Sequence, residues 1–273
     1  MVKTPGGHRR LPVTSLVRFA REEGHPLQDP LALAQSEPAP QQGSRAVRAA
    51  LLGALLADDG RAVHGVLEAE WLAGRAIDGL CDALITPTLS ELGERWRMGK
   101  VAIYQERRAC ELLQRALLRL GEALAPRGER AHPRRLLALG GALEGDPYEL
   151  PTLMAELVLR ERGFDARSLG AGLPAETIAR AIAERRPRLV WVAAAVNGDQ
   201  ARFACEFARI ADAASSVGAA VAVGGRALHR SLRQQLRYST FCDAMAHLAT
   251  FADALMATGG ASEPEPRSRA RQP

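Results

Sequence analysis

Four short apolar runs, separated by longer amphipathic segments, constrain the second half of this chain more than any other feature. The segments between the runs, such as TLMAELVLRERG and AETIARAIAERR, carry apolar residues at helical spacing. Strands that alternate with helices in this way form a parallel sheet with helices on both faces. We therefore predict an α/β domain over residues 134–258, a Rossmann-like doubly wound parallel sheet. The predicted strands are 135–143, 166–172, 188–196 and 219–225.

Three loops of this predicted domain directly follow strands and would meet at one edge of the sheet. Their sequences are GDPYELP at 145–151, AAAVNGD at 193–199 and VGGRALH at 223–229. Sheets of this class bind ligands outside the carboxyl ends of their strands, where such loops converge. The sequence therefore predicts a ligand site that is built from these three loops.

Residues 46–128 have a different pattern, in which apolar residues recur at helical spacing over long stretches. The turn-like sequence DDG at 58–60 interrupts the first stretch, and Pro87 predicts either a kink or a new helix start in the second. A third amphipathic stretch follows from Val101. Four or so helices with short connections predict a four-helix bundle. The predicted fold class is thus α plus α/β.

The remaining segments have the composition of linkers and tails. Residues 24–45 are rich in Pro, Gln, Gly and Ser, as linkers are, and residues 259–273 have the composition of a disordered tail. No apolar run reaches transmembrane length, and the first residues lack the apolar core of a signal peptide. The four cysteines form no CxxC pair and indicate a reducing compartment. We therefore expect a cytoplasmic protein without a membrane partner.

Charge and missing motifs restrict the function. The net charge of +5 allows an acidic partner such as DNA, although scattered Arg in an Ala-rich chain equally reflects genomic base composition. The sequence contains no GxSxG nucleophile elbow, no Walker loop and no His pair at metal-ligand spacing. Ser90, Ser168 and Ser231 have no His or Asp partner by motif. We therefore predict that the chain is not an enzyme.

The three loops resemble the cobalamin-binding fold, whose pattern is Asp-x-His-x-x-Gly, then Ser-x-Leu, then Gly-Gly. The first element aligns with Asp146, Tyr148 and Pro151. The spacing agrees with the family, because 41 residues separate the first element from the second and 28 separate the second from the third. The second and third elements align with Ala193 and Ala195, and with Gly224 and Gly225.

The helical block resembles the bundle that precedes this fold in methionine synthase and in cobalamin-dependent photoreceptor regulators of the MerR type. The photoreceptors carry a Trp, nine residues, and then Glu-His. This chain has Trp96, nine residues, and then Glu106 and Arg107. The resemblance implies that Trp96 covers the upper face of a flat ligand. From the residues alone, a Trp that packs the bundle against the sheet domain is an equal reading.

Residues 1–23 resemble the wing and the following helix of a MerR-type winged helix. In this resemblance, the basic residues of the wing contact DNA phosphates, which adds affinity without sequence information. The helix-turn-helix itself would precede the wing, so either the start codon lies upstream of Met1 or the chain is a truncated regulator. The predicted DNA-binding residues are Lys3, His8, Arg9 and Arg10.

The resemblance also implies that several cobalamin contacts are altered. The family His that ligates cobalt is Tyr148 here, and a protonated phenol is a poor cobalt ligand. Asp146, whose family counterpart orients that His, would orient the phenol or cap the next helix. Pro151 replaces a Gly and is suited to the first turn of a helix. Ala193 and Ala195 lack the hydroxyl and the Leu side chain that would hold the nucleotide tail.

Several readings of these positions stay open. Tyr148 plugs an empty site, or cobalamin binds without a protein axial ligand, or another ligand occupies the site. Gly224 and Gly225 permit close approach of a ligand or of the chain, or they form an ordinary turn. Arg107 has no free lone pair for cobalt, and it pairs with a carboxylate or faces solvent.

The predicted function is a transcriptional regulator or signalling sensor that has a cobalamin-type domain, altered so that His-ligated cobalamin is not expected. The chain would act as a homo-oligomer on DNA, either as an apo-protein or through another ligand. One alternative is the corrinoid-binding subunit of a methyltransferase, which Tyr148 argues against. Another is a haem sensor, for which the ligands would be drawn from His132, His229 and His247.

Overall fold

The computed structural model describes residues 2–3, 9–10, 41–124, 136–196 and 198–259. The chain divides into two compact units, Met1–Arg130 and Ala131–Pro273, and each unit is described by itself below. At the start of the first unit, β1 (Val2–Lys3) pairs with β2 (Arg9–Arg10) in the antiparallel sense. Residues 24–40 of the predicted linker at 24–45 lie outside the described residues, and residues 41–45 begin a helix. Of the predicted tail at 259–273, only Gly259 is described, as the last residue of a helix.

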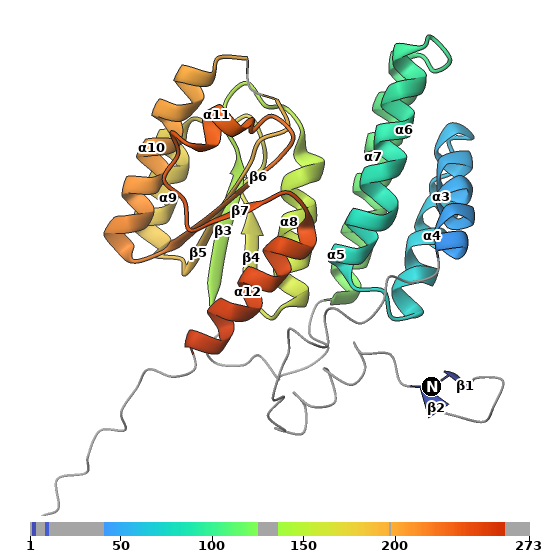
Figure 1. The fold of residues 1–273 in the computed structure, drawn as a ribbon, viewed down its shortest axis with the longest axis horizontal. Coiled ribbons are helices and arrows are strands. Elements are labelled where there is room, and N and C mark those ends of the chain that lie inside the picture. The colour runs from blue at the N-terminus through green and yellow to red at the C-terminus, as the bar shows by residue number, and fades with distance from the viewer. Residues whose placement is uncertain (1, 4–8, 11–40, 125–135, 197, 260–273) are drawn as a thin grey trace, which may run out of the picture. The chain divides into compact units, whose positions relative to one another are not determined.

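The first unit is helical (Figure 1). Its helices pack around a core of Leu and Ile side chains. The largest buried side chains include Leu51, Leu67, Leu84 and Leu117, none of which is measurably exposed. The sequence predicts such a core because apolar residues recur on one face of each helix. Its elements are α3 (Gln41–Leu56), α4 (Gly60–Leu72), α5 (Ile77–Leu80), η1 (Cys81–Ile85), α6 (Thr86–Arg97) and α7 (Ile103–Leu124).

The predicted turn at 58–60 separates α3 from α4. Asp58 adopts a left-handed conformation, with φ of 56°, and Asp59 caps α4. The Asp59 carboxylate accepts hydrogen bonds from the backbone N–H groups of Arg61, at 3.0 Å, and Ala62, at 2.9 Å. These bonds satisfy two donors that the first turn of a helix otherwise leaves without a partner.

Pro87 lies in the first turn of α6, which begins at Thr86, so the prediction of a new helix start is confirmed, although the rod from Ile77 to Arg97 stays helical through the turn before it. A proline inside a helix cannot donate to the carbonyl four residues earlier, and its ring crowds that carbonyl. Here the turn before Pro87 is a π-helix, in which the N–H of Thr86 reaches back to the carbonyl of Cys81. The wider turn relieves the crowding and lets the rod continue.

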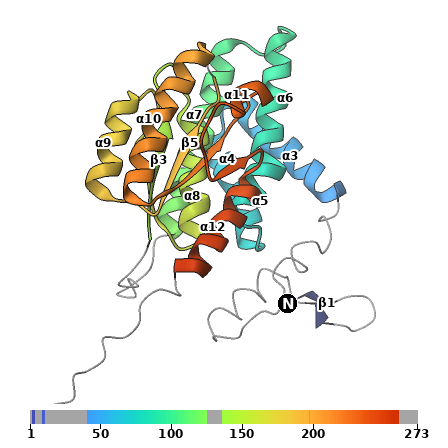
Figure 2. The ribbon, with the colours of Figure 1, turned by 60° about the vertical axis from the view of Figure 1, so that its left-hand side comes forward.

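The second unit is a five-stranded parallel sheet with the order β4-β3-β5-β6-β7, and helices cover both of its faces (Figures 1 and 2). The helices α9 and α10 pack on one face, and α8 and α12 pack on the other. The strands are β3 (Leu137–Ala142), β4 (Asp165–Ser168), β5 (Leu189–Ala193), β6 (Ala220–Gly224) and β7 (Thr240–Cys242). The helices are α8 (Glu149–Glu161), α9 (Ala175–Arg185), α10 (Gln200–Val217), α11 (Arg230–Arg233) and α12 (Met245–Gly259).

The predicted fold class, a helical part followed by a doubly wound parallel sheet, is confirmed. The bounds of the strands and their number differ from the sequence prediction, and the third predicted strand ends at Ala193 and not at residue 196. The second strand ends at Ser168 and not at residue 172, because Gly170 and Gly172 turn the chain with φ of 97° and 68°. The fifth strand, β7, was not predicted, because a strand of three residues has too short a pattern to recognise.

Candidate functional site

The predicted ligand loops lie where the order of the strands reverses. β3 lies between β4 and β5, so the chain moves one way from β3 to β4 and the other way from β5 to β6. In the register of the sheet, Ala193 lies between Ala142 of β3 and Gly224 of β6. The loops after these three strands therefore begin at one level, and this edge is the usual ligand position of the fold.

Asp146, which follows β3, joins two of these loops through its buried carboxylate. Its Oδ2 accepts hydrogen bonds from the backbone N–H groups of Ala195, at 2.5 Å, and Val196, at 3.1 Å. Its Oδ1 accepts a third from the N–H of Tyr148, at 3.1 Å. Only 3% of the residue is exposed, so the carboxylate is satisfied by the chain and not by water. We refer to these three bonds as the Asp146 tie.

Tyr148 and Pro151 occupy the start of α8. Tyr148 is the residue before the helix and is half-buried, and its side chain makes no capping bond. Pro151 lies in the first turn, as predicted, where the missing N–H costs no helical hydrogen bond. This position therefore offers a phenol and a closed helix start, where the family pattern has an imidazole and a flexible Gly.

The strand face beside Ala193 is filled by Trp191, which the sequence analysis did not single out. Trp191 is 2% exposed, and its indole N–H donates to Oγ1 of Thr152 in α8 at 2.9 Å. Thr152 Oγ1 also lies 3.0 Å from Oγ of Ser168 in β4. A Cβ at Gly140, the neighbour of Trp191 in β3, would lie 2.1 Å from the indole ring. Adjacent Gly residues in a strand were the signal for such a bulky neighbour.

Gly224 and Gly225 make room for the chain. A Cβ at Gly225, where φ is 132°, would lie 2.1 Å from the carbonyl oxygen of Ala194. A Cβ at Gly224 would lie 2.7 Å from the carbonyl oxygen of Cys242. Of the readings that the sequence left open, close approach of neighbouring strands explains both glycines. Burial also raises the pKa of Cys242, which lies beside Gly224, to about 11, so this thiol is protonated at pH 7.

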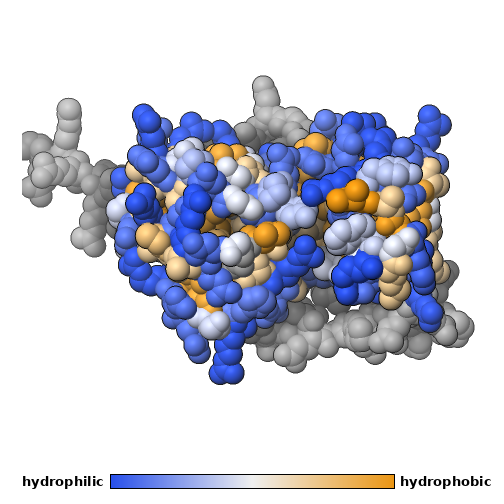
Figure 3. Space-filling view, turned by 90° about the horizontal axis from the view of Figure 1, so that it is seen from above, coloured by the Kyte–Doolittle hydropathy of each residue, from blue (hydrophilic) through white to orange (hydrophobic). Residues whose placement is uncertain are grey.

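The predicted site residues of the helical unit lie on either side of the turn between α6 and α7. Trp96 is 46% exposed, and Ile103 and Tyr104 are more exposed still. Glu106 lies in the first turn of α7, accepts a hydrogen bond from Sγ of Cys110 at 3.5 Å, and lies 3.8 Å from Nε of Arg107. Arg107 therefore pairs with a carboxylate, one of the roles that the sequence left open. Exposed apolar side chains that lie together mark interaction surfaces. Figure 3 shows one face of the protein, on which hydrophilic residues predominate and smaller hydrophobic areas lie among them.

The predicted haem ligands do not form a site in the described residues. His229 and His247 are exposed and lie on different elements, at the start of α11 and within α12. Nδ1 of His247 accepts a hydrogen bond from the N–H of Asp243 at 3.3 Å. His132 lies outside the described residues. No group of three or more His, Cys, Asp or Glu suited to a metal ion occurs among the residues that the structure describes.

Of the predicted DNA-binding residues, Lys3 lies in β1 and pairs with Arg9 of β2, which Arg10 follows. His8 lies outside the described residues. An antiparallel pair at this point is what a wing requires, although the contact with DNA stays a prediction. Within the described helices, none is long and apolar enough to cross a membrane.

Comparisons with known proteins identify the class of the helical unit. Residues 47–120 match the family profile of the B12 binding domain. The first unit is thus similar to a B12 binding domain over residues 47–120. The solved monomethylamine corrinoid protein of Methanosarcina barkeri matches 78% of this chain and 100% of its own, with a TM-score of 0.63 and 14% identity, which shows a shared fold.

Two curated relatives of this chain are transcriptional repressors. The chain is 29% identical over 196 residues to the HTH-type transcriptional repressor CarH of Myxococcus xanthus, a match that covers 71% of this chain and 63% of CarH. It is 28% identical over 224 residues to the repressor CarA of the same organism, covering 81% of this chain and 73% of CarA. The chain thus spans less than two thirds of CarH. These matches confirm the resemblance to B12-binding domains and to transcriptional repressors that was stated from the sequence, while the MerR type stays a prediction.

Proposed function

We propose that this chain is the regulatory part of a transcriptional repressor whose α/β unit works without a His-ligated cobalamin. Support for the regulator comes from the two repressor relatives and from the basic β1–β2 pair. One observation supports the loss of the usual ligand: the Asp146 tie uses both carboxylate oxygens on the chain's own backbone. In the family pattern this carboxylate would orient an axial imidazole, which the chain lacks at position 148.

The filled strand face supports the same proposal. Trp191 and Thr152 occupy the space beside Ala193, where the resemblance places the nucleotide tail. Ala193 also has no hydroxyl that could hydrogen-bond such a tail. A regulator without bound cobalamin would act through protein contacts. Its proposed partners are DNA and a second copy of the chain. The exposed side chains of Trp96, Ile103 and Tyr104 form a proposed surface for such contacts.

The test is corrinoid retention by the full chain. Incubation with hydroxocobalamin, methylcobalamin or adenosylcobalamin, followed by desalting and absorbance spectroscopy, should leave the protein colourless. The matched variant Tyr148→His/Pro151→Gly restores the imidazole and the flexible backbone, and it should retain more corrinoid than the native chain. Stoichiometric corrinoid on the native protein after dialysis would contradict the proposal.

The DNA-binding part is tested separately by salt dependence. Lys3→Ala/Arg9→Ala/Arg10→Ala should weaken binding to duplex DNA, and each lost phosphate contact should reduce the slope of log K against log salt by about 0.9. Binding that is equal in the native chain and in this variant would show that β1 and β2 do not contact DNA.

The alternative function, a corrinoid-binding subunit of a methyltransferase, is supported only by the shared fold.

A further inference from the structure

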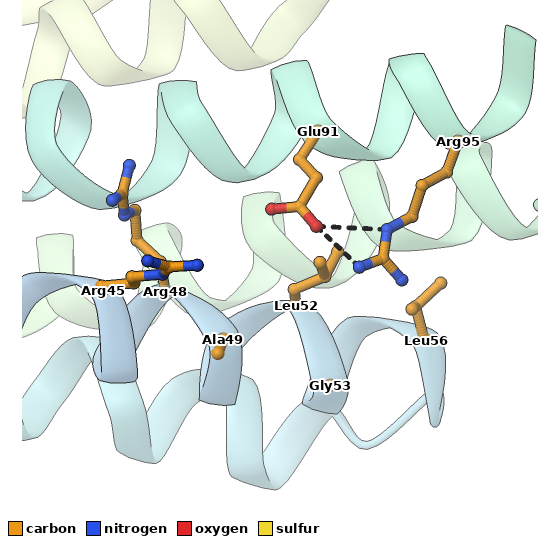
Figure 4. Close-up of a pocket in the computed structure, with 8 residues that line it drawn as sticks. All are labelled: Arg45, Arg48, Ala49, Leu52, Gly53, Leu56, Glu91 and Arg95. Atoms are coloured by element: carbon orange, nitrogen blue, oxygen red, sulfur yellow. Dashed lines mark hydrogen bonds and ion pairs between the residues drawn. The ribbon is translucent and has the colours of Figure 1, made fainter.

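A groove with an apolar floor lies between α3 and α6 of the helical unit (Figure 4). Its volume is about 410 Å³, which falls in the range of small-molecule sites. Leu52 and Leu56 line it, and between them Gly53 leaves it open, because a Cβ at Gly53 would meet no atom within 4 Å. Gly is disfavoured in a helix interior, and here it leaves out a side chain that would fill the groove.

The walls of the groove carry an excess of positive charge. Nη2 of Arg95 lies 2.6 Å from Oε1 of Glu91, so these two side chains neutralise each other. Arg45 and Arg48 also line the groove, and Figure 4 shows their guanidinium groups next to one another at one end. Within the described part of the chain, neither group has a carboxylate partner. Three guanidinium groups and one carboxylate leave two positive charges unbalanced.

Arg45 and Arg48 lie three residues apart in α3, where two like charges repel each other. Their proximity therefore does not stabilise the helix. A guanidinium presents a planar fork of N–H donors that matches a carboxylate or a phosphate, and two forks side by side provide a receptor for one acidic group. The apolar floor beside them would contact an apolar body attached to that group. We propose that this groove binds an organic acid, with its carboxylate or phosphate on Arg45 and Arg48 and its apolar body on Leu52 and Leu56.

The apolar floor favours a small acid over nucleic acid. A DNA backbone would neutralise the guanidinium groups but would leave Leu52 and Leu56 without an apolar partner. The inference does not depend on the proposed function, because its test needs neither corrinoid nor DNA binding at the N-terminal segment.

The experiment is isothermal titration calorimetry of the full chain with octanoate and with octyl phosphate, using 1-octanol as the neutral probe. Both acids should bind, and binding should weaken as the salt concentration rises. The neutral alcohol should bind at least about tenfold more weakly, since it lacks the charge-assisted hydrogen bonds. Equal affinity for the acids and the alcohol, or no binding of either acid, would overturn the proposal.

Charge variants locate the head group. Arg45→Ala/Arg48→Ala should weaken octanoate binding by at least about tenfold. The control Arg61→Ala/Arg119→Ala removes the same charge from exposed positions that do not line the groove, and it should leave the affinity within about twofold. Equal weakening by both variants would show only a general charge effect and would overturn the site.

A filling variant locates the apolar body without loss of charge. Gly53→Leu should abolish octanoate binding while it keeps or raises the stability of α3, because Leu is a better helix former than Gly. Gly65→Leu is the matched control, since a Cβ at Gly65 in α4 also meets nothing within 4 Å and lies outside the groove. Unchanged binding in Gly53→Leu, or displacement of octanoate by a short DNA duplex, would overturn the assignment.

Discussion

At the scale of single residues, Asp146 lies at the predicted ligand position and bonds the backbone of the chain itself. A buried carboxylate needs hydrogen-bond donors, and here the three donors come from the backbone of its own loop and of the loop after β5. The Asp146 tie therefore holds together the edge that a ligand would otherwise open. Tyr148 and Pro151 lie nearby at the start of α8, where Pro151 fits the first turn of the helix.

Asp146→Asn should destabilise the α/β unit by about 1–3 kcal/mol, because an amide N–H₂ would face at least one backbone N–H and leave it without an acceptor. Urea unfolding measures the loss, and hydrogen exchange should show faster exchange at the amides of Ala195 and Val196. The control is Asp165→Asn, whose exposed ion pair with Arg167 contributes about 1 kcal/mol or less. Equal stability of Asp146→Asn and the native chain would show that the tie is dispensable.

At the scale of elements, the ends of the strands are fixed by the small residues between them. β5 and β6 approach so closely that Gly225 contacts the backbone of Ala194, whose N–H also bonds the carbonyl of Gly224 at 2.9 Å. The two glycines were predicted as part of a site, and they serve the packing of the strands. The π-turn before Pro87 is the corresponding adjustment in the helical unit, because it fits a proline into a continuous rod.

Gly225→Ala should cost about 3 kcal/mol or more, because the new Cβ would overlap the carbonyl of Ala194 at a φ that L-residues rarely adopt. The urea midpoint and the soluble yield should both fall. Gly198→Ala is the control in the neighbouring loop, where a Cβ meets nothing within 4 Å, and it should change stability by about 0.5 kcal/mol or less. If both variants have the same urea midpoint as the native chain, the close approach does not require a glycine at position 225.

At the scale of the whole molecule, two units with separate cores make up the described chain. The helical core consists largely of Leu and Ile. On the sheet face that α9 and α10 cover, Val190 and Val192 of β5 pack with Phe207 and Ile210 of α10. Because each unit is compact, we expect a defect in one core to act first on its own unit.

Leu84→Ala and Ile210→Ala test this separation, since both side chains are fully buried, one in each core. Each should destabilise its own unit by about 2–5 kcal/mol. Hydrogen exchange followed by mass spectrometry should show faster exchange within 41–124 for Leu84→Ala and within 136–259 for Ile210→Ala. Loss of protection in both units from either variant would show that the two cores unfold together.

The sequence alone determined the fold class and the edge of the sheet where the three loops meet, because helical and strand periodicity are local and parallel strands share one direction. It also identified Asp146 and the two glycines as special positions. Only the tertiary structure decided what these residues contact: two of the three partners of Asp146 lie 49 and 50 positions away, and Trp191 bonds a residue 39 positions away. Such partners depend on the order of the strands in the sheet, and no local pattern records that order.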